Sequence, residues 1–115
     1  MTLNVHTRET GGVTVMEIEG RVLVGEASAK LHDAVREQLT KGARKIVLQL
    51  RGVTYIDSSG VGEMVSALSA TRKAGGELKL SDLAPKVRDL MQMTNLNKIF
   101  ELTLDEAAAI QALGK

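Results

Sequence analysis

Two serines behind an aspartate, Asp57-Ser58-Ser59, are the residues of this chain best placed to do chemistry. Upstream, residues 45–50 form an almost unbroken apolar run, which is typical of a strand buried on both faces of a parallel sheet. Downstream, apolar residues recur at helical spacing over residues 61–68. The hydroxyls are therefore expected where a strand gives way to a helix, at the sheet edge where ligands gather and a helix start favours negative charge. A phosphate on either serine would be accommodated there.

A purely structural role for these residues is to cap the helix, which contributes about 1 kcal/mol to stability. One cap suffices for one helix, whereas the chain offers both Ser58 and Ser59. Gly60 and Gly62 follow, and residues without a side chain keep a surface open to a partner. From these residues alone, both a cap and a binding site stay open.

An enzymatic role would need one of the two serines as a nucleophile with a base in reach. The elbow pattern G-x-S-x-G is absent. The imidazoles are His6, expected on an exposed strand, and His32, expected on a solvated helix face. Gly75-Gly76 lacks the spacing of a phosphate-binding loop, and two distant histidines without any cysteine make no metal site. We therefore expect no catalysis, no cofactor and no metal.

Composition narrows the class of protein further. A chain of 115 residues predicts a single domain, residues 1–115, around one core. Lys and Arg number 15 against 14 Asp and Glu, with the signs interleaved, so a nucleic-acid partner is not expected. No stretch approaches the roughly 18 apolar residues of a membrane span, and the charged start does not resemble a signal peptide, so we expect a cytoplasmic protein without a membrane partner.

Glycine, proline and hydrophobic periodicity predict the order of elements. The expected elements are a hairpin of segments 3–7 and 13–18, a helix over 26–40 ended by Gly42, a strand over 45–50, a helix from Ser58 to about Lys73, a strand around Leu78 and Leu80, a short helix from Pro85, a brief strand near Glu101, and a last helix through Leu113 opened by a capping box of Thr103 and Glu106. Strands that alternate with helices predict an α/β layer structure.

The methionines give a weaker indication of a surface. Met64 has the spacing of a core residue, whereas Met91 and Met93 lie two apart and cannot both face inward from one helix. One of this pair marks a partner surface or fills a gap in the core, and the spacing alone favours neither.

Several stretches, taken in order, resemble the STAS domain, and within it the anti-sigma factor antagonists. They are Ile46–Leu50, Val53–Gly62, Gly75–Leu80 and Val87–Met91 with the continuation to Ile99-Phe100. The resemblance extends over residues 13 to 113 and so covers nearly the whole chain. It implies a STAS-type α/β fold, with a small mixed sheet of four to five strands packed with about four helices.

The resemblance also implies a bacterial protein switch that is not an enzyme. The family's phosphoacceptor is the first serine of an Asp-Ser-Ser/Thr-Gly motif, which corresponds to Ser58. Asp57, Ser59 and Gly60 would then support the site, with Ser59 as the N-cap and Asp57 fixing the turn or accepting a backbone N–H. The unmodified protein would bind an anti-sigma factor, itself a serine kinase that uses ATP and magnesium, and so release a sigma factor for transcription. A separate phosphatase would reset Ser58.

A partner is expected to contact both sides of this motif. The expected contacts are Val61, Gly62 and Met64 on the helix and Arg21, Val22 and Leu23 after the second strand. Here the chain departs from the family, because many antagonists carry an acidic Glu-Leu-Asp-like stretch after the glycine that ends that strand. The alternative is a STAS module for interaction or ligand sensing in a signalling or transport complex, which contacts its partner without phosphorylation.

Overall fold

Gly11 and Gly12 join the first two strands in a hairpin turn. Their φ angles of 56° and 81° lie in the left-handed region, which glycine adopts without strain. The computed structural model describes residues 3–22, 25–98, 102–103 and 105–113. Five strands form one sheet in the order of the chain: β1 (Asn4–Thr10), β2 (Val13–Val22), β3 (Lys45–Ile56), β4 (Glu77–Ser81) and β5 (Leu102–Thr103). β1 is antiparallel to β2, and every later neighbour is parallel, which confirms the predicted mixed α/β sheet.

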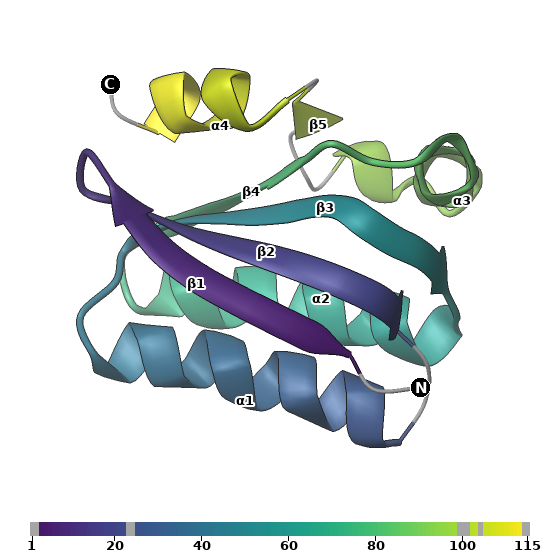
Figure 1. Cartoon of the computed structure of the whole chain (residues 1–115), viewed down its shortest axis with the longest axis horizontal. Helices are drawn as coiled ribbons and strands as arrows, with labels where there is room; N and C mark the ends of the chain where they lie inside the picture. Colours follow the sequence, from purple (N-terminus) through teal and green to yellow (C-terminus); the bar gives the residue numbers. More distant parts are fainter. Residues whose placement is uncertain (1–2, 23–24, 99–101, 104, 114–115) are drawn as a thin grey trace.

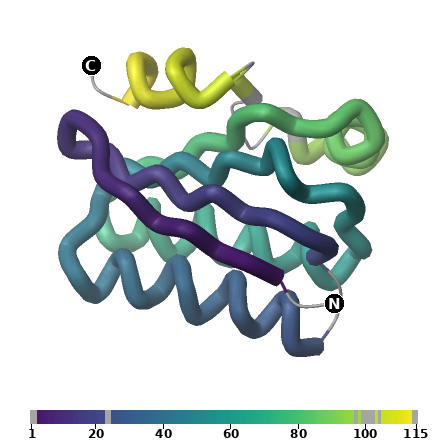
Figure 2. Tube along the Cα trace, in the orientation of Figure 1, coloured from purple at the N-terminus to yellow at the C-terminus, as the bar shows by residue number. Residues whose placement is uncertain are grey.

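The helices lie on both faces of the sheet (Figure 1). α1 (Glu26–Thr40) and α2 (Ser58–Lys73) cover one face, since both β–α–β connections pass on the same side (Figure 2). α4 (Glu106–Leu113) lies over the other face, and α3 (Pro85–Met93) lies beside the far end of β3, followed by a short 3₁₀ turn, η1 (Leu96–Lys98). Within the described ranges, no helix has both the length and the apolar character of a membrane crossing.

The main core fills the space between the sheet and the pair α1 and α2. Its centre is β3, where Ile46, Val47, Leu48 and Leu50 are at most 1% exposed, as the apolar run predicts. On α2, Leu68 is buried, and Val61 and Val65 are half-buried against the same core. A smaller apolar cluster lies under α4: Val13, Val15, Val47, Ala109 and Leu113.

β3 runs beyond the predicted segment 45–50 and continues to Ile56. The pairing of β2 with β3 shifts register after Glu17 and again after Gly20. A Cβ on Gly52 would lie 2.6 Å from the Glu19 side chain, so the absence of a side chain lets the two strands stay in contact through the shift. This extension brings the chain to Asp57 at the end of the central strand.

The predicted capping box of Thr103 and Glu106 is wrong. Asp105 is the residue that caps α4, because its carboxylate accepts a hydrogen bond from the N–H of Ala108 at 2.9 Å. Thr103 instead belongs to β5, where its hydroxyl donates to the carbonyl of Leu80 at 2.8 Å. The brief strand predicted near Glu101 is therefore present as β5, although Glu101 itself lies outside the described residues.

Candidate functional site

The candidate site is the connection between β3 and α2. Asp57 has extended backbone angles, φ −95° and ψ −178°, and its Oδ1 accepts the N–H of Gly60 at 2.8 Å. Asp57 is thus the N-cap, and Ser58 is the first residue of the helix. The prediction that Asp57 accepts a backbone N–H is confirmed, and the prediction that Ser59 is the cap is wrong, because Ser59 already lies inside the first turn.

The end of β2 packs directly against this first turn. The N–H of Asp57 donates to the carbonyl of Val22 at 3.2 Å. A Cβ on Gly60 would lie 2.4 Å from that same carbonyl oxygen and 2.9 Å from Ile56 Cγ2. Gly60 is therefore buried and allows close approach of two backbones, whereas Gly62 is exposed and a Cβ there would meet nothing within 4 Å. Of the two glycines, only Gly62 leaves the surface open.

Ser58 and Ser59 are both exposed at the start of α2. The first turn of this helix holds no acidic residue, and none of the side-chain hydrogen bonds found among the described residues uses either hydroxyl. The partial positive charge of the helix start faces the same solvent. An anionic group attached to either oxygen would be stabilised by that field, and both hydroxyls are accessible to a modifying enzyme.

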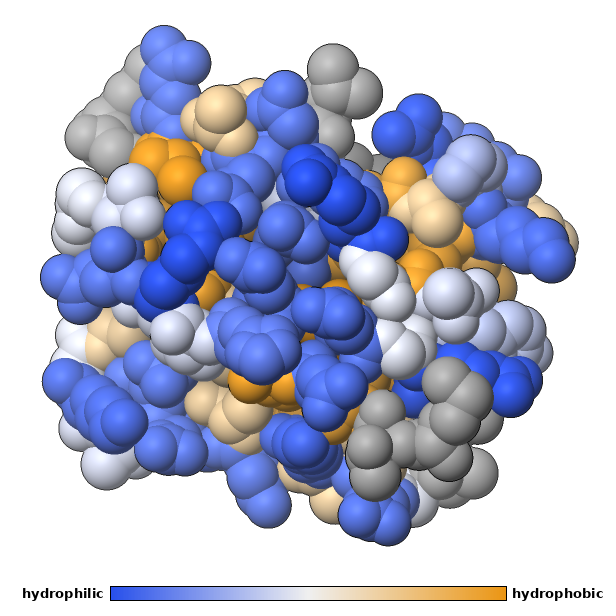
Figure 3. All heavy atoms as spheres, in the orientation of Figure 1, coloured by the Kyte–Doolittle hydropathy of each residue, from blue (hydrophilic) through white to orange (hydrophobic). Residues whose placement is uncertain are grey.

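A groove opens beside the site, between the end of β3 and α3. Its volume is about 310 Å³, and its lining is Thr54, Tyr55, Ile56, Lys86, Val87, Asp89, Leu90 and Met93. Tyr55 is 48% exposed and Met93 is 81% exposed, which makes them the large exposed hydrophobic residues of the described chain. In Figure 3, apolar side chains reach the surface on the right, over the region where Figure 1 has α3. A groove with these two residues at its surface suits contact with a partner.

A match to the STAS domain family spans residues 4–109. The chain belongs to the STAS domain family. It is 28% identical to the anti-sigma F factor antagonist of Paenibacillus polymyxa, over 98% of this chain and 97% of that one. The fold matches the crystal structure of an anti-sigma factor antagonist from Mycobacterium paratuberculosis with a TM-score of 0.85 and 20% identity, over 98% of this chain and 95% of that one. It also matches the Bacillus cell fate determinant SpoIIAA, solved in the phosphorylated form, with a TM-score of 0.71 and 19% identity, over 95% of this chain and 99% of that one.

The STAS fold places the residues predicted to contact a partner at very different depths. Val61 is half-buried and Gly62 is exposed. Met64 and Val22 are both fully buried in the main core, so their prediction as partner contacts is wrong. The reason for Met64 is helical spacing, since the residue lies four positions before the buried Leu68 and faces the sheet with it.

The structure describes only part of the segment after Gly20, where the chain departs from the family's acidic stretch. Arg21 is exposed, and its guanidinium carbon lies 5.5 Å from the centre of the Tyr55 ring, which is the geometry of a cation–π contact. Leu23 lies outside the described residues. Tyr55 was not among the predicted site residues, although it lies inside the motif and is one of only two aromatic residues in the chain.

The histidines do not assemble a catalytic site with the serines. His32 lies on α1 with 41% of its side chain exposed, and its Nδ1 lies 2.5 Å from Glu63 Oε1 on α2. His6 lies on β1. Among the described residues, no hydrogen bond joins either imidazole to Ser58 or Ser59, and no three side chains form a group that could hold a metal ion.

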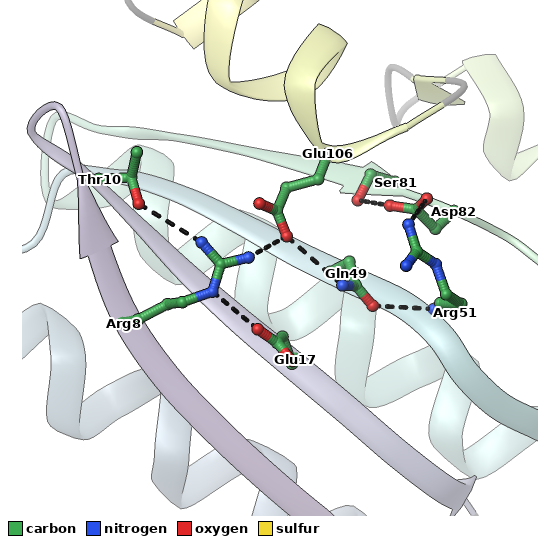
Figure 4. A network of polar contacts seen from close by, with 8 residues as sticks. All are labelled: Arg8, Thr10, Glu17, Gln49, Arg51, Ser81, Asp82 and Glu106. Carbon is green, nitrogen blue, oxygen red and sulfur yellow. Dashed lines mark hydrogen bonds and ion pairs between the residues drawn. The ribbon is translucent and has the colours of Figure 1, made fainter.

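A second group of polar residues fastens α4 to the sheet (Figure 4). Arg8 on β1 donates to Glu17 at 2.7 Å and forms an ion pair with Glu106 at the start of α4. Gln49 on β3 donates to the same Glu106 carboxylate at 3.4 Å. The hydrogen bonds to Glu106 and Glu17 raise the pKa of the Arg8 guanidinium above its ordinary value. This group connects four elements, β1, β2, β3 and α4, and its role is to hold the fold.

Proposed function

We propose that this protein is an anti-sigma factor antagonist switched by phosphorylation of Ser58. The unmodified protein binds an anti-sigma factor in the cytoplasm and so frees a sigma factor for transcription. The observation that carries the proposal is the exposed Ser58 hydroxyl at the first position of α2, beside the Asp57 cap. The same role is supported by a relative named an anti-sigma F factor antagonist, which matches this chain over almost the whole length of both proteins.

The surface around Ser58 supplies the partner contact. Gly62 leaves space for close approach, and Val61 and the groove lined by Tyr55 and Met93 offer apolar area. Such a surface associates through burial of apolar groups, which is lost when a charge must be desolvated in the same interface. The unmodified serine is small and neutral, so it fits a closely packed contact.

Phosphorylation acts on binding with little cost to the fold. A phosphate adds about −1.5 to −2 charges at pH 7 and three acceptor oxygens. The start of α2 favours negative charge, so the helix stays intact. Inside the interface the same group meets packed apolar residues and must lose its water, which weakens the complex. The position of Ser58 thus separates the effect on binding from the effect on stability.

The chemistry of the switch belongs to the partners. The chain contributes the hydroxyl that is modified, and the anti-sigma factor acts as the serine kinase with its own ATP and magnesium. A phosphatase acting on phosphorylated Ser58 resets the switch. Neither nucleic acid nor a membrane takes part in this cycle.

Copurification from the native host, followed by mass spectrometry, tests the proposal. We expect the unmodified protein to bring down an anti-sigma factor, and incubation of that complex with ATP to label Ser58. Ser58→Ala should retain the partner and remain unlabelled, with Ser59→Ala as the matched control that is still labelled. Labelling of Ser59 alone would move the switch to that residue. A stable partner without any labelling would favour a STAS module that works without phosphorylation.

A further inference from the structure

The last part of β3 has a strand neighbour on one side only. β2 pairs with β3 as far as Val22 and Ile56, whereas β4 pairs with it only as far as Ser81 and Gln49. After Ser81 the left-handed backbone of Asp82, with φ of 58°, turns the chain out of the sheet towards α3, which lies beside the end of β3 (Figure 1). Among the described residues, no strand therefore covers the α3 side of β3 after Gln49.

Ile56 directs its backbone polar groups towards this open side. The N–H of Asp57 donates to the carbonyl of Val22 on β2 at 3.2 Å. The carbonyl of Ile56 belongs to the same trans peptide unit, so it points the opposite way, away from β2. Backbone groups alternate in direction along a strand, so the N–H of Ile56 points to the same side as its carbonyl. No hydrogen bond found among the described residues joins either group to α3 or to a loop.

These two backbone groups need a hydrogen-bonding partner. Ile56 is a lining residue of the groove and is only 4% exposed. Backbone groups with so little access to water are nearly always hydrogen-bonded. Earlier in β3 the protein supplies such a bond itself, since Gln49 Oε1 accepts the N–H of Arg51 at 3.2 Å. Nothing comparable serves Ile56 within the described ranges, so its N–H and carbonyl indicate a bonding partner from outside the chain.

The groove lies between this strand edge and one face of α3. The helix lines it with residues at the spacing of a single helical face: Lys86, Asp89, Leu90 and Met93. Tyr55 and Met93 are exposed there, and both residue types are enriched where proteins meet. A peptide in extended conformation can pair its backbone with such an edge while its alternate side chains enter the groove.

The charges beside the groove favour an acidic segment. Lys86 lines the groove, and Arg21 lies at its edge, 5.5 Å from the centre of the Tyr55 ring. Among the described residues, the ion pairs within 4 Å include neither cation, and Asp89 is the one carboxylate that lines the groove. Two cations against one carboxylate attract a peptide that carries negative charge.

We propose that an extended segment of the anti-sigma factor adds to the open edge of β3 as a further strand, between β3 and α3. Its backbone exchanges hydrogen bonds with the N–H and carbonyl of Ile56. Its alternate side chains are apolar and pack against Leu90 and Met93, and it carries a carboxylate for the two cations. The edge ends two residues before Ser58, so the added strand and the proposed phosphoacceptor belong to one interface.

The inference rests on the proposed function only in naming the anti-sigma factor as the source of the segment. Random peptides displayed on phage and selected against the whole protein test the strand addition without that partner. We expect the selected peptides to alternate apolar and polar residues and to include an acidic one. A synthetic copy of one of them, added to the ¹⁵N-labelled protein, should slow hydrogen exchange of the Ile56 amide by roughly tenfold or more. The Asp57 amide, already bonded to Val22, is the internal control and should exchange slowly in both states.

Two neighbouring exposed residues of α3 provide matched variants, since Met93 lines the groove and Gln92 does not. Met93→Asp should weaken the peptide by roughly tenfold, because it places a carboxylate against an apolar and acidic segment, whereas Gln92→Asp should stay within about twofold. Lys86→Gln should weaken binding by about threefold and make it less sensitive to salt.

The same measurements can overturn the inference. A selection that yields no binding peptide, or a bound peptide that leaves exchange of the Ile56 amide unchanged, would exclude strand addition. Apolar residues at helical spacing in the selected peptides would replace the strand by a helix, and protection of Ile56 that rises with protein concentration alone would replace it by a second copy. The peptide should also displace the copurified anti-sigma factor, and protection of Ile56 without displacement would overturn the assignment of the segment to that partner.

Discussion

Ser58 is held in place by neighbours whose own contacts do not involve its hydroxyl. Asp57 caps α2, and Gly60, which has no side chain, lets the first turn pack against the carbonyl of Val22. The stability of the turn therefore depends on residues other than the proposed phosphoacceptor. Under the proposed switch, a phosphate on Ser58 would leave the helix start folded.

The two glycines of the motif allow a matched test of this packing. Gly60→Ala should lower the free energy of unfolding by about 1 to 3 kcal/mol, because a Cβ would overlap the carbonyl of Val22. Gly62→Ala should raise it by about 0.5 to 1 kcal/mol, since an open helical position gains propensity. Urea unfolding of both variants gives the comparison. Equal effects of the two substitutions would show that Gly60 is not tightly packed.

The cap offers a second test at single residues. Asp57→Ala should cost about 1 kcal/mol of folding stability through loss of the bond to the N–H of Gly60. Ser59→Ala should change stability by less than about 0.5 kcal/mol, because Ser59 is an exposed helical residue. Thermal unfolding at pH 7 measures both. A larger loss of stability in Ser59→Ala than in Asp57→Ala would show that Ser59 is the N-cap.

Sequence patterns located this motif but not the roles within it. Aspartate and serine cap helices about equally well, so the pattern Asp57-Ser58-Ser59 leaves the start of the helix uncertain by a residue or two. Gly60 and Gly62 look alike in the sequence, and only the contact with Val22 distinguishes them. Roles that depend on contact with a distant strand could not be predicted from local spacing.

At the scale of elements, α3 determines which part of the site is apolar. Met91 is fully buried and Met93 is 81% exposed, so the spacing argument that only one could face inward is confirmed. Which of the two faces outward depends on where the helix begins, and Pro85 at its first turn sets that phase. The same phase places Met93 at the groove beside Tyr55.

Substitution of the two methionines should therefore affect different properties, stability for Met91 and partner binding for Met93. Met91→Ala should destabilise the protein by about 2 to 5 kcal/mol, because it leaves a cavity in the core. Met93→Ala should change stability by less than about 0.5 kcal/mol and should weaken binding of the anti-sigma factor. Chemical unfolding and a binding titration of the two variants test this. Unchanged affinity in Met93→Ala would exclude the groove from the interface.

At the scale of the whole molecule, the order of strands and helices followed from the sequence because each apolar run and each glycine acts locally. Residues 45–50 alone indicated the central strand, and the helix over 26–40 has the predicted bounds. The position of α4 could not be predicted, since it depends on contacts far apart in the sequence: Ala109 and Leu113 pack against Val47, and Arg8 pairs with Glu106 across 98 residues. Long-range polar contacts of this kind leave no periodic pattern.

The fold as a whole presents Ser58, the groove and Arg21 at one end of the sheet, where β2 and β3 finish. Their proximity is a property of parallel strands, whose carboxyl ends meet at one edge. A partner that covers this end contacts residues from three elements at once. A charge placed at its centre therefore affects the whole interface.

The affinity of the copurified anti-sigma factor for this protein, in its unmodified form and with phosphoserine at position 58, tests the central claim most directly. An unpaired charge in an interface costs on the order of 2 to 3 kcal/mol, so we predict binding weaker by roughly 30- to 150-fold, with Ser58→Asp showing a smaller loss. Ser58→Ala should bind as the unmodified protein does, before and after incubation with ATP. Equal affinity of the phosphorylated and unmodified proteins in calorimetric titration would contradict the account.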